Sequence, residues 1–180
     1  MGSFPGILDS IITECIQEMT GSTAGMESYK IAIVAMGSQS EVEASVASVI
    51  GFSGEMIKGS LAISSEKSLL DKSHPNHAMG MPVADADLSD WSGEIANQIL
   101  GRIKNKVSKV GATFSMATPT NMVGKRMQIT TPKDGGSLQI TVDGPFGQMT
   151  IFFLATLDPA LVLDGSKAAE TAKEGEAILF

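Results

Sequence analysis

The order of the expected secondary-structure elements repeats once along the chain, and this repeat limits the fold more than any other feature of the sequence. Each half begins with an amphipathic helix, expected over residues 7–19 in the first half and 87–110 in the second. Apolar, β-branched segments that read as strands follow at 29–36, 46–52 and 56–64, and again at 112–118, 137–142 and 148–155. Neither half can cover both faces of its own strands, so one shared sheet is the expected packing. The sequence predicts an α+β domain in which two helix–βββ halves share a mostly antiparallel sheet, with the long helices on one face.

The segment between the two halves carries weaker signals. A short helix is expected over residues 65–72, with Ser64 or Ser65 as its N-terminal cap. Residues 74–84 contain two prolines, a glycine and an asparagine, and this composition favours a loop.

A chain of 180 residues has room for one domain with a sizeable core. We expect this domain over residues 1–157. Residues 158–180 are mostly small or charged and are expected to form a tail, whose order the sequence leaves open. A short helix around 166–173 is compatible with the composition of this tail.

Charge and composition exclude several classes of partner. Lysine and arginine total 13 against 20 aspartate and glutamate residues, which gives a net charge of −7. Binding to a phosphate backbone needs a broad basic face, so nucleic acid is not expected as a partner. No apolar run reaches the roughly 18 residues of a membrane-spanning helix, and the single cysteine, Cys15, has no partner for an internal disulfide. We therefore expect a cytoplasmic protein without a membrane partner.

The helix expected over residues 87–110 carries the most informative surface. At about 100° per residue, its apolar stripe contains Leu88, Trp91, Ser92, Ile95, Ile99 and Ile103. The opposite side presents Asp90, Glu94, Asn97 and Gly101. An interior glycine costs a helix about 1 kcal/mol relative to alanine, and close approach of another backbone is one reason to keep it. Gly93 flanks the same side, which suggests a helix that is thin around its carboxylate and carboxamide.

The chemistry open to this carboxylate and carboxamide is narrow. A carboxamide has a donor and an acceptor and can hold a water in line with an electrophile, while an exposed glutamate can pair with a lysine of a partner. Neither Asn97 nor Glu94 is an activated nucleophile. The pair suits hydrolysis of an acyl phosphate on a docked partner that supplies its own metal. The same residues are also what an ordinary solvated helix face contains.

The segment from Asp90 to Gly101, followed by the stretch that ends at Pro119, resembles the CheX branch of the CheC/CheX/FliY chemotaxis phosphatases. The motif of that family is Asp or Ser, Glu four residues later and Asn three residues further on, with a proline about two dozen residues downstream. Asp90, Glu94, Asn97 and Pro119 match these positions, and Gly101 matches a glycine common after the asparagine.

The resemblance implies a phosphatase that dephosphorylates the aspartyl phosphate of a CheY-like response regulator. It makes Glu94 the carboxylate that pairs with the active-site lysine of the regulator, and Asn97 the amide that positions the attacking water. Asp90 and Gly101 are then peripheral, partner-contacting residues. The regulator contributes Mg²⁺, so this chain is expected to bind no metal or other cofactor itself. A non-catalytic adaptor that binds a regulator or a flagellar-switch component through the same surface is the alternative.

Some members of the family carry a second motif on the first helix. The matching stretch here is Ser10, Glu14 and Gln17, with glutamine in place of the asparagine. The longer side chain holds its amide about one carbon–carbon bond further out, so we expect a degenerate, inactive second site. The resemblance also implies a homodimer joined through exposed sheet edges.

Other possible metal sites are weaker. His74 and His77 share a loop, but a zinc site needs three or four ligands, and no further histidine exists in the chain. Asp85, Asp87 and Asp90 crowd a helix N-terminus, where the helix dipole favours acidic residues. The spacing of an EF-hand is absent.

Overall fold

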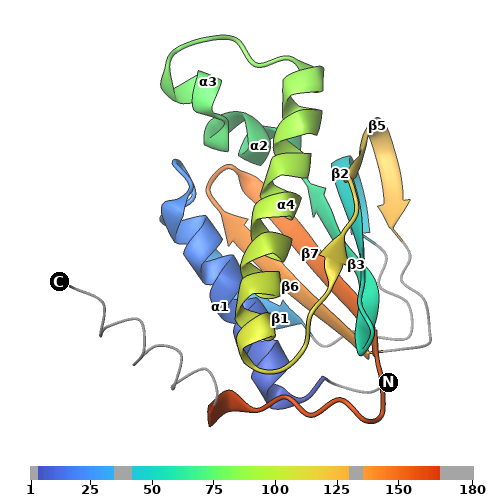
Figure 1. The fold of residues 1–180 in the computed structure, drawn as a ribbon. Helices are drawn as coiled ribbons and strands as arrows, with labels where there is room; N and C mark the ends of the chain where they lie inside the picture. The colour runs from blue at the N-terminus through green and yellow to red at the C-terminus, as the bar shows by residue number, and fades with distance from the viewer. Residues whose placement is uncertain (1–3, 35–41, 130–135, 167–180) are drawn as a thin grey trace, which may run out of the picture.

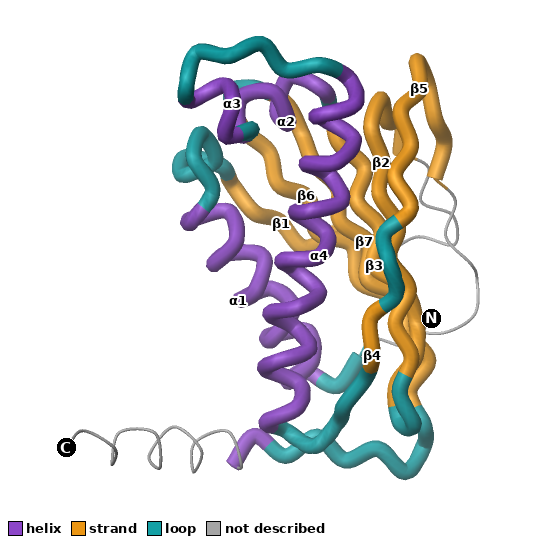
Figure 2. The backbone as a smooth tube through the Cα atoms, turned by 45° about the horizontal axis from the view of Figure 1, so that its top comes forward, coloured by secondary structure: helices purple, strands orange, loops and turns teal. Residues whose placement is uncertain are grey.

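A single antiparallel sheet forms the frame of the protein, and its helices cover one face (Figures 1 and 2). The computed structural model describes residues 4–34, 42–129 and 136–166. The helices are α1 (Gly6–Ser22), α2 (Lys67–Ser73), α3 (Pro75–Ala78) and α4 (Asp85–Lys109). The strands are β1 (Lys30–Val34), β2 (Val42–Ser53), β3 (Ile57–Ser65), β4 (Ser115–Met116), β5 (Thr120–Ile129), β6 (Gly136–Gly144) and β7 (Gly147–Leu157).

The strand order shows the two halves of the chain clearly. The seven strands run β1-β6-β7-β3-β2-β4, and β5 also pairs with β2. The third strands of the two halves, β3 and β7, therefore lie together at the centre, with β2 and β6 outside them and β1 and β5 outermost. All of the pairings are antiparallel. The predicted α+β fold with one shared sheet is confirmed.

The first strand of the second half was predicted in the wrong place. Only Ser115 and Met116 of the predicted segment 112–118 form a strand, and the long strand β5 follows it. The sequence signal for β5 is weak because Gly124 and Lys125 interrupt its apolar residues. An edge strand tolerates such residues because only one of its sides is paired.

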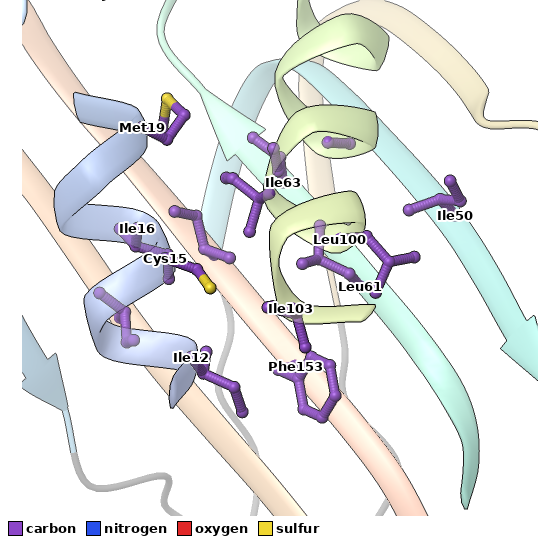
Figure 3. Close-up of a cluster of buried hydrophobic side chains, with 14 of the residues drawn as sticks. Ile12, Cys15, Ile16, Met19, Ile50, Leu61, Ile63, Leu100, Ile103 and Phe153 are labelled. Carbon is purple, nitrogen blue, oxygen red and sulfur yellow. The ribbon is translucent and has the colours of Figure 1, made fainter. Parts of the chain in front are cut away.

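The core lies between the sheet and the stripes of α1 and α4. From α1 the buried apolar side chains are Leu8, Ile11, Ile12, Cys15, Ile16 and Met19. From α4 they include Leu88, Ile95, Ile99, Leu100, Ile103 and Val107. Figure 3 shows Ile103 of α4 next to Phe153 of the sheet, whose side chain is 1% exposed. The predicted helical stripes are confirmed.

Two local predictions between the halves are wrong. Neither Ser64 nor Ser65 caps α2, because both continue β3 and pair with β7, and Glu66 occupies the capping position without a side-chain hydrogen bond. The predicted loop at 74–84 contains the single turn α3, in which the backbone N–H of Asn76 donates to Nδ1 of His74 (3.0 Å).

The first part of the predicted tail packs against the ends of the two long helices. The backbone N–H of Asp164 donates to the carbonyl of Val110 at 2.9 Å, and Leu161 and Leu163 pack against the core. The predicted helix at 166–173 lies outside the described residues beyond its first residue. The division of the chain at residue 157 stays a prediction.

Replacing Phe153 by alanine should lower the free energy of unfolding by about 3–5 kcal/mol, because the change leaves a cavity at the centre of the core. Chemical denaturation followed by circular dichroism measures this difference. Val162→Ala is the matched control, because Val162 is 78% exposed, and it should change the stability by less than about 0.5 kcal/mol. Equal losses for the two variants would contradict this assignment of the core.

Candidate functional site

The N-terminus of α4 is anchored by its own acidic residues. Oδ2 of Asp87 accepts a hydrogen bond from the backbone N–H of Ala84 at 2.8 Å, and Asp85 forms a 2.7 Å ion pair with Lys67. These contacts satisfy the helix end and complement its dipole. Two of the three aspartates considered for calcium therefore have structural partners, and Asp90 is exposed one turn further on.

The predicted site residues of α4 lie on its outer face. Glu94 is exposed, and Asn97 is half-buried beside it. Nε2 of Gln98 donates to Oε1 of Glu94 at 3.0 Å, which restricts the glutamate side chain without burying it. Within the described ranges, the carboxamide of Asn97 has no hydrogen-bond partner. A carboxylate held in place and a free carboxamide thus sit less than one helical turn apart. Sequence reasoning missed Gln98, although its position four residues after Glu94 was a signal.

The two glycines of α4 have opposite surroundings. A Cβ at Gly101 would meet no atom within 4 Å, so the space beside this turn is open. A Cβ at Gly93 would lie 2.7 Å from both terminal amide atoms of Asn121 on β5. Gly93 is buried, and it lets the helix approach the sheet. The prediction that Gly93 thins the outer face of the helix is wrong.

Asn121 is in turn fixed by the sheet. The hydroxyl of Ser48, a fully buried residue of β2, donates to Oδ1 of Asn121 at 2.8 Å. This hydrogen bond fixes the distance between strands β2 and β5 and the turn of α4 that carries Glu94 and Asn97. The predicted proline, Pro119, lies just before β5 and brings the chain into this strand.

The described part of the tail leaves this face free. The backbone N–H of Asp164 in the tail donates to the carbonyl of Val110, just past the end of α4. Val110 is 13 residues after Asn97, which corresponds to about 20 Å along the helix axis.

The sequence also matches the sequence model of a known protein family. The model of the chemotaxis phosphatase CheX matches residues 46–143, which is more than half of the chain. The chain belongs to the CheX family. No curated protein matches the sequence.

Solved structures of CheX-family and CheC-like proteins share the fold. A CheC-like superfamily protein from Shewanella sp. PV-4 is 26% identical, with a TM-score of 0.69 over 82% of this chain and 96% of its own. The chemotaxis protein CheX from Vibrio vulnificus is 20% identical, with a TM-score of 0.69 over 83% and 99%. A complex of CheX, CheY, BeF₃ and Mg²⁺ from Borrelia burgdorferi matches at 14% identity, with a TM-score of 0.62 over 83% and 97%.

The second motif, on α1, has different surroundings from the motif on α4. Glu14 on α1 forms a 2.9 Å ion pair with Lys106 of α4, which also contacts Glu18 at 2.7 Å. The hydrogen bond from Lys106 lowers the pKa of Glu18. Gln17 is exposed. The carboxylate of the second motif is therefore engaged in joining the two long helices, whereas that of Glu94 is not.

The single cysteine and the two histidines of the chain also have structural surroundings. Burial raises the pKa of the Cys15 thiol to about 12, so it is not a nucleophile near neutral pH. His77 Nδ1 lies 3.1 Å from Asp71, and the ring of His74 meets Trp91 edge-on at 5.7 Å.

Across residues 4–34, 42–129 and 136–166, no group of three metal-ligating side chains is present. None of the helices in these ranges is long and apolar enough to cross a membrane.

Gly93→Ala should destabilise the protein by about 1–3 kcal/mol, although alanine has the higher helix propensity, because the methyl group collides with the fixed amide of Asn121. Gly21→Ala on α1 is the matched control, since a Cβ there meets no atom within 4 Å. That variant should be neutral or up to about 1 kcal/mol more stable. Thermal and urea unfolding measure both effects, and a stabilised Gly93→Ala protein would show that the helix does not sit this close to β5.

Proposed function

We propose that this chain dephosphorylates the aspartyl phosphate of a CheY-like response regulator. The observation that carries the proposal is the placement of Glu94 and Asn97 side by side on the outer face of α4, in a chain of the CheX family. The complex from Borrelia burgdorferi, in which CheX is bound to CheY with BeF₃ and Mg²⁺, supports a regulator as the partner. The substrate is thus a group on another protein, reached by a convex helix surface.

Each side chain has one task in the proposed reaction. The carboxylate of Glu94 pairs with the active-site lysine of the regulator and sets the register of docking. The carboxamide of Asn97 then orients a water toward phosphorus. As the water oxygen bonds to phosphorus, the bond from phosphorus to the aspartyl oxygen breaks, the aspartate leaves as a carboxylate and inorganic phosphate is released. The Mg²⁺ of the regulator stabilises the charge on the phosphoryl oxygens, so this chain needs no metal of its own.

The surroundings of the two residues suit these tasks. The carboxamide of Asn97 would not have to break an internal hydrogen bond in order to hold a water. Gln98 limits the rotamers of Glu94, which reduces the entropy lost on docking. Asp90 adds a negative charge one turn before Glu94, and the open space at Gly101 leaves room for the backbone of the regulator.

The arrangement favours one active surface per chain. Glu14 would have to leave its ion pair with Lys106 before it could bind a lysine of a partner. Gln17 carries its amide on a longer stem than Asn97. We therefore propose that the α1 motif is inactive.

We further propose a homodimer joined through a sheet edge. In the part of the chain that the structure describes, β1 pairs with β6 alone, and Ile33 on this strand is 57% exposed. An unpaired edge with an exposed apolar side chain is a template for pairing with a second copy. Sedimentation equilibrium tests the dimer, and a monomer at micromolar concentration would contradict it.

Asn97→Ala should reduce the rate constant of regulator dephosphorylation by about 100-fold or more, because the water loses its orienting amide. The decay of a ³²P-labelled CheY-like regulator in Mg²⁺ measures this rate. Asn105→Ala changes another amide of α4, two turns further along, and should retain the wild-type rate. Binding without acceleration by the wild-type protein would establish the adaptor instead, and equal rates for Asn97→Ala and the wild type would remove Asn97 from the reaction.

Glu94→Gln should act mainly on docking. The amide keeps the side-chain length but loses the charge that pairs with lysine, so KM should rise about tenfold or more while kcat changes less. The same phosphate-decay experiment over a range of regulator concentrations separates the two constants. A fall in kcat alone would contradict the docking role.

A further inference from the structure

We infer that the surface that docks the regulator continues from α4 onto strand β5, where Val123 forms its apolar part. This inference rests on the proposed function and adds a specificity-determining residue outside the helix. Val123 is 40% exposed, although its strand lies beside a long helix. The register of β5 determines which face of the sheet carries the side chain of Val123.

The register places Val123 on the helix-covered face of the sheet. Val123 is paired with Val46, which is fully buried in the core under the helices. Asn121 is paired with Ser48 and abuts Gly93 of α4. Residues two apart on a strand share a face, so Val123 and Asn121 both point to the side on which α4 lies.

Val123 also lies at the level of the site. The ion pair between Lys67 and Asp85 places the start of α4 near the end of β3, and Ser65 in that region is paired with Val46. From Asn121, which lies beside Gly93, the step to Val123 is about 6.6 Å along the strand and leads toward the start of α4. This is roughly one helical turn and brings Val123 to the level of Asp90. Figures 1 and 2 show β5 beside the first half of α4.

Gly93 makes helix and strand one continuous surface. Because it has no side chain, the amide of Asn121 reaches the helix backbone, so β5 lies directly against the turn of α4 that carries Glu94. An exposed apolar side chain next to a carboxylate and a carboxamide has the composition of a protein-binding surface, in which an apolar contact adds affinity and the polar groups fix orientation. The matching partner is a regulator with an apolar side chain beside its active-site lysine.

The neighbouring residue provides a matched control. Met122 is 39% exposed, nearly the same as Val123, but it is paired with Ala47 and points to the opposite face of the sheet. A regulator docked on α4 can reach Val123 and cannot reach Met122. In the described residues β5 pairs with β2 alone, and a second copy of the chain added along its other edge would not distinguish the two residues in this way.

The experiment compares Val123→Asp with Met122→Asp. For each protein, titration calorimetry gives the affinity for a CheY-like regulator held with BeF₃⁻ and Mg²⁺, and the phosphate-decay assay gives kcat and KM. Val123→Asp should weaken binding and raise KM at least about tenfold while kcat stays within about twofold. Met122→Asp should bind and react like the wild type. Val123→Ala, a milder change, should weaken binding about threefold and guards against misfolding of the aspartate variant.

Other outcomes overturn the inference in distinguishable ways. Equal affinities of all variants and the wild type would remove β5 from the docking surface, while the proposed function stands on Asn97. A lower molecular mass of Val123→Asp in sedimentation, with unchanged regulator affinity, would assign this surface to a second copy instead. Regulator binding that depends on Val123 but brings no hydrolysis would refute the proposed phosphatase and keep the docking surface. Absence of regulator binding by the wild-type protein would refute both.

Discussion

The burial of one stripe of α4 against the sheet fixes everything that the outer face of this helix can do. Ile95, Ile99 and Ile103 lie in the core, so the helix cannot rotate without exposing them. The orientation of α4 about its own axis therefore brings Glu94 and Asn97 to the surface together. The two groups that we propose to bind a partner are therefore held in place by residues on the opposite side of the same helix.

The distance between α4 and the sheet is fixed as firmly as the orientation of the helix about its axis. Asn121, held by Ser48, meets α4 at Gly93, and the missing side chain at that position allows close contact. Gly101, in contrast, faces open space, in which the backbone of the proposed partner could approach the helix. Two glycines on one helix thus serve two interfaces, one inside the protein and one proposed for a partner. Lys106 adds a third constraint by joining α4 to Glu14 and Glu18 of α1.

The sequence predicts the elements with strong periodicity and misses those that depend on their neighbours. The apolar stripes of α1 and α4 are local patterns, and both helices are confirmed. Strand β5 is formed by pairing with β2 in spite of Gly124 and Lys125, so no local run of residues reveals it. The position of Asn97 on the outer face of α4 follows from helical spacing. The contact of Gly93 with Asn121 and the pairing of Glu14 with Lys106, in contrast, join distant parts of the chain. Such contacts can be identified only once the fold is known.

In the proposed complex, the carboxamide of α4, and not that of α1, enters the phosphorylation site of the regulator. Replacing the Mg²⁺ of a BeF₃⁻-bound regulator by paramagnetic Mn²⁺ tests this directly, because nearby amide protons of the bound partner lose their NMR signals. We expect the side-chain amide signal of Asn97 to disappear in the complex while that of Gln17 remains sharp. A sharp Asn97 signal in a fully formed complex, or selective loss of the Gln17 signal, would contradict it.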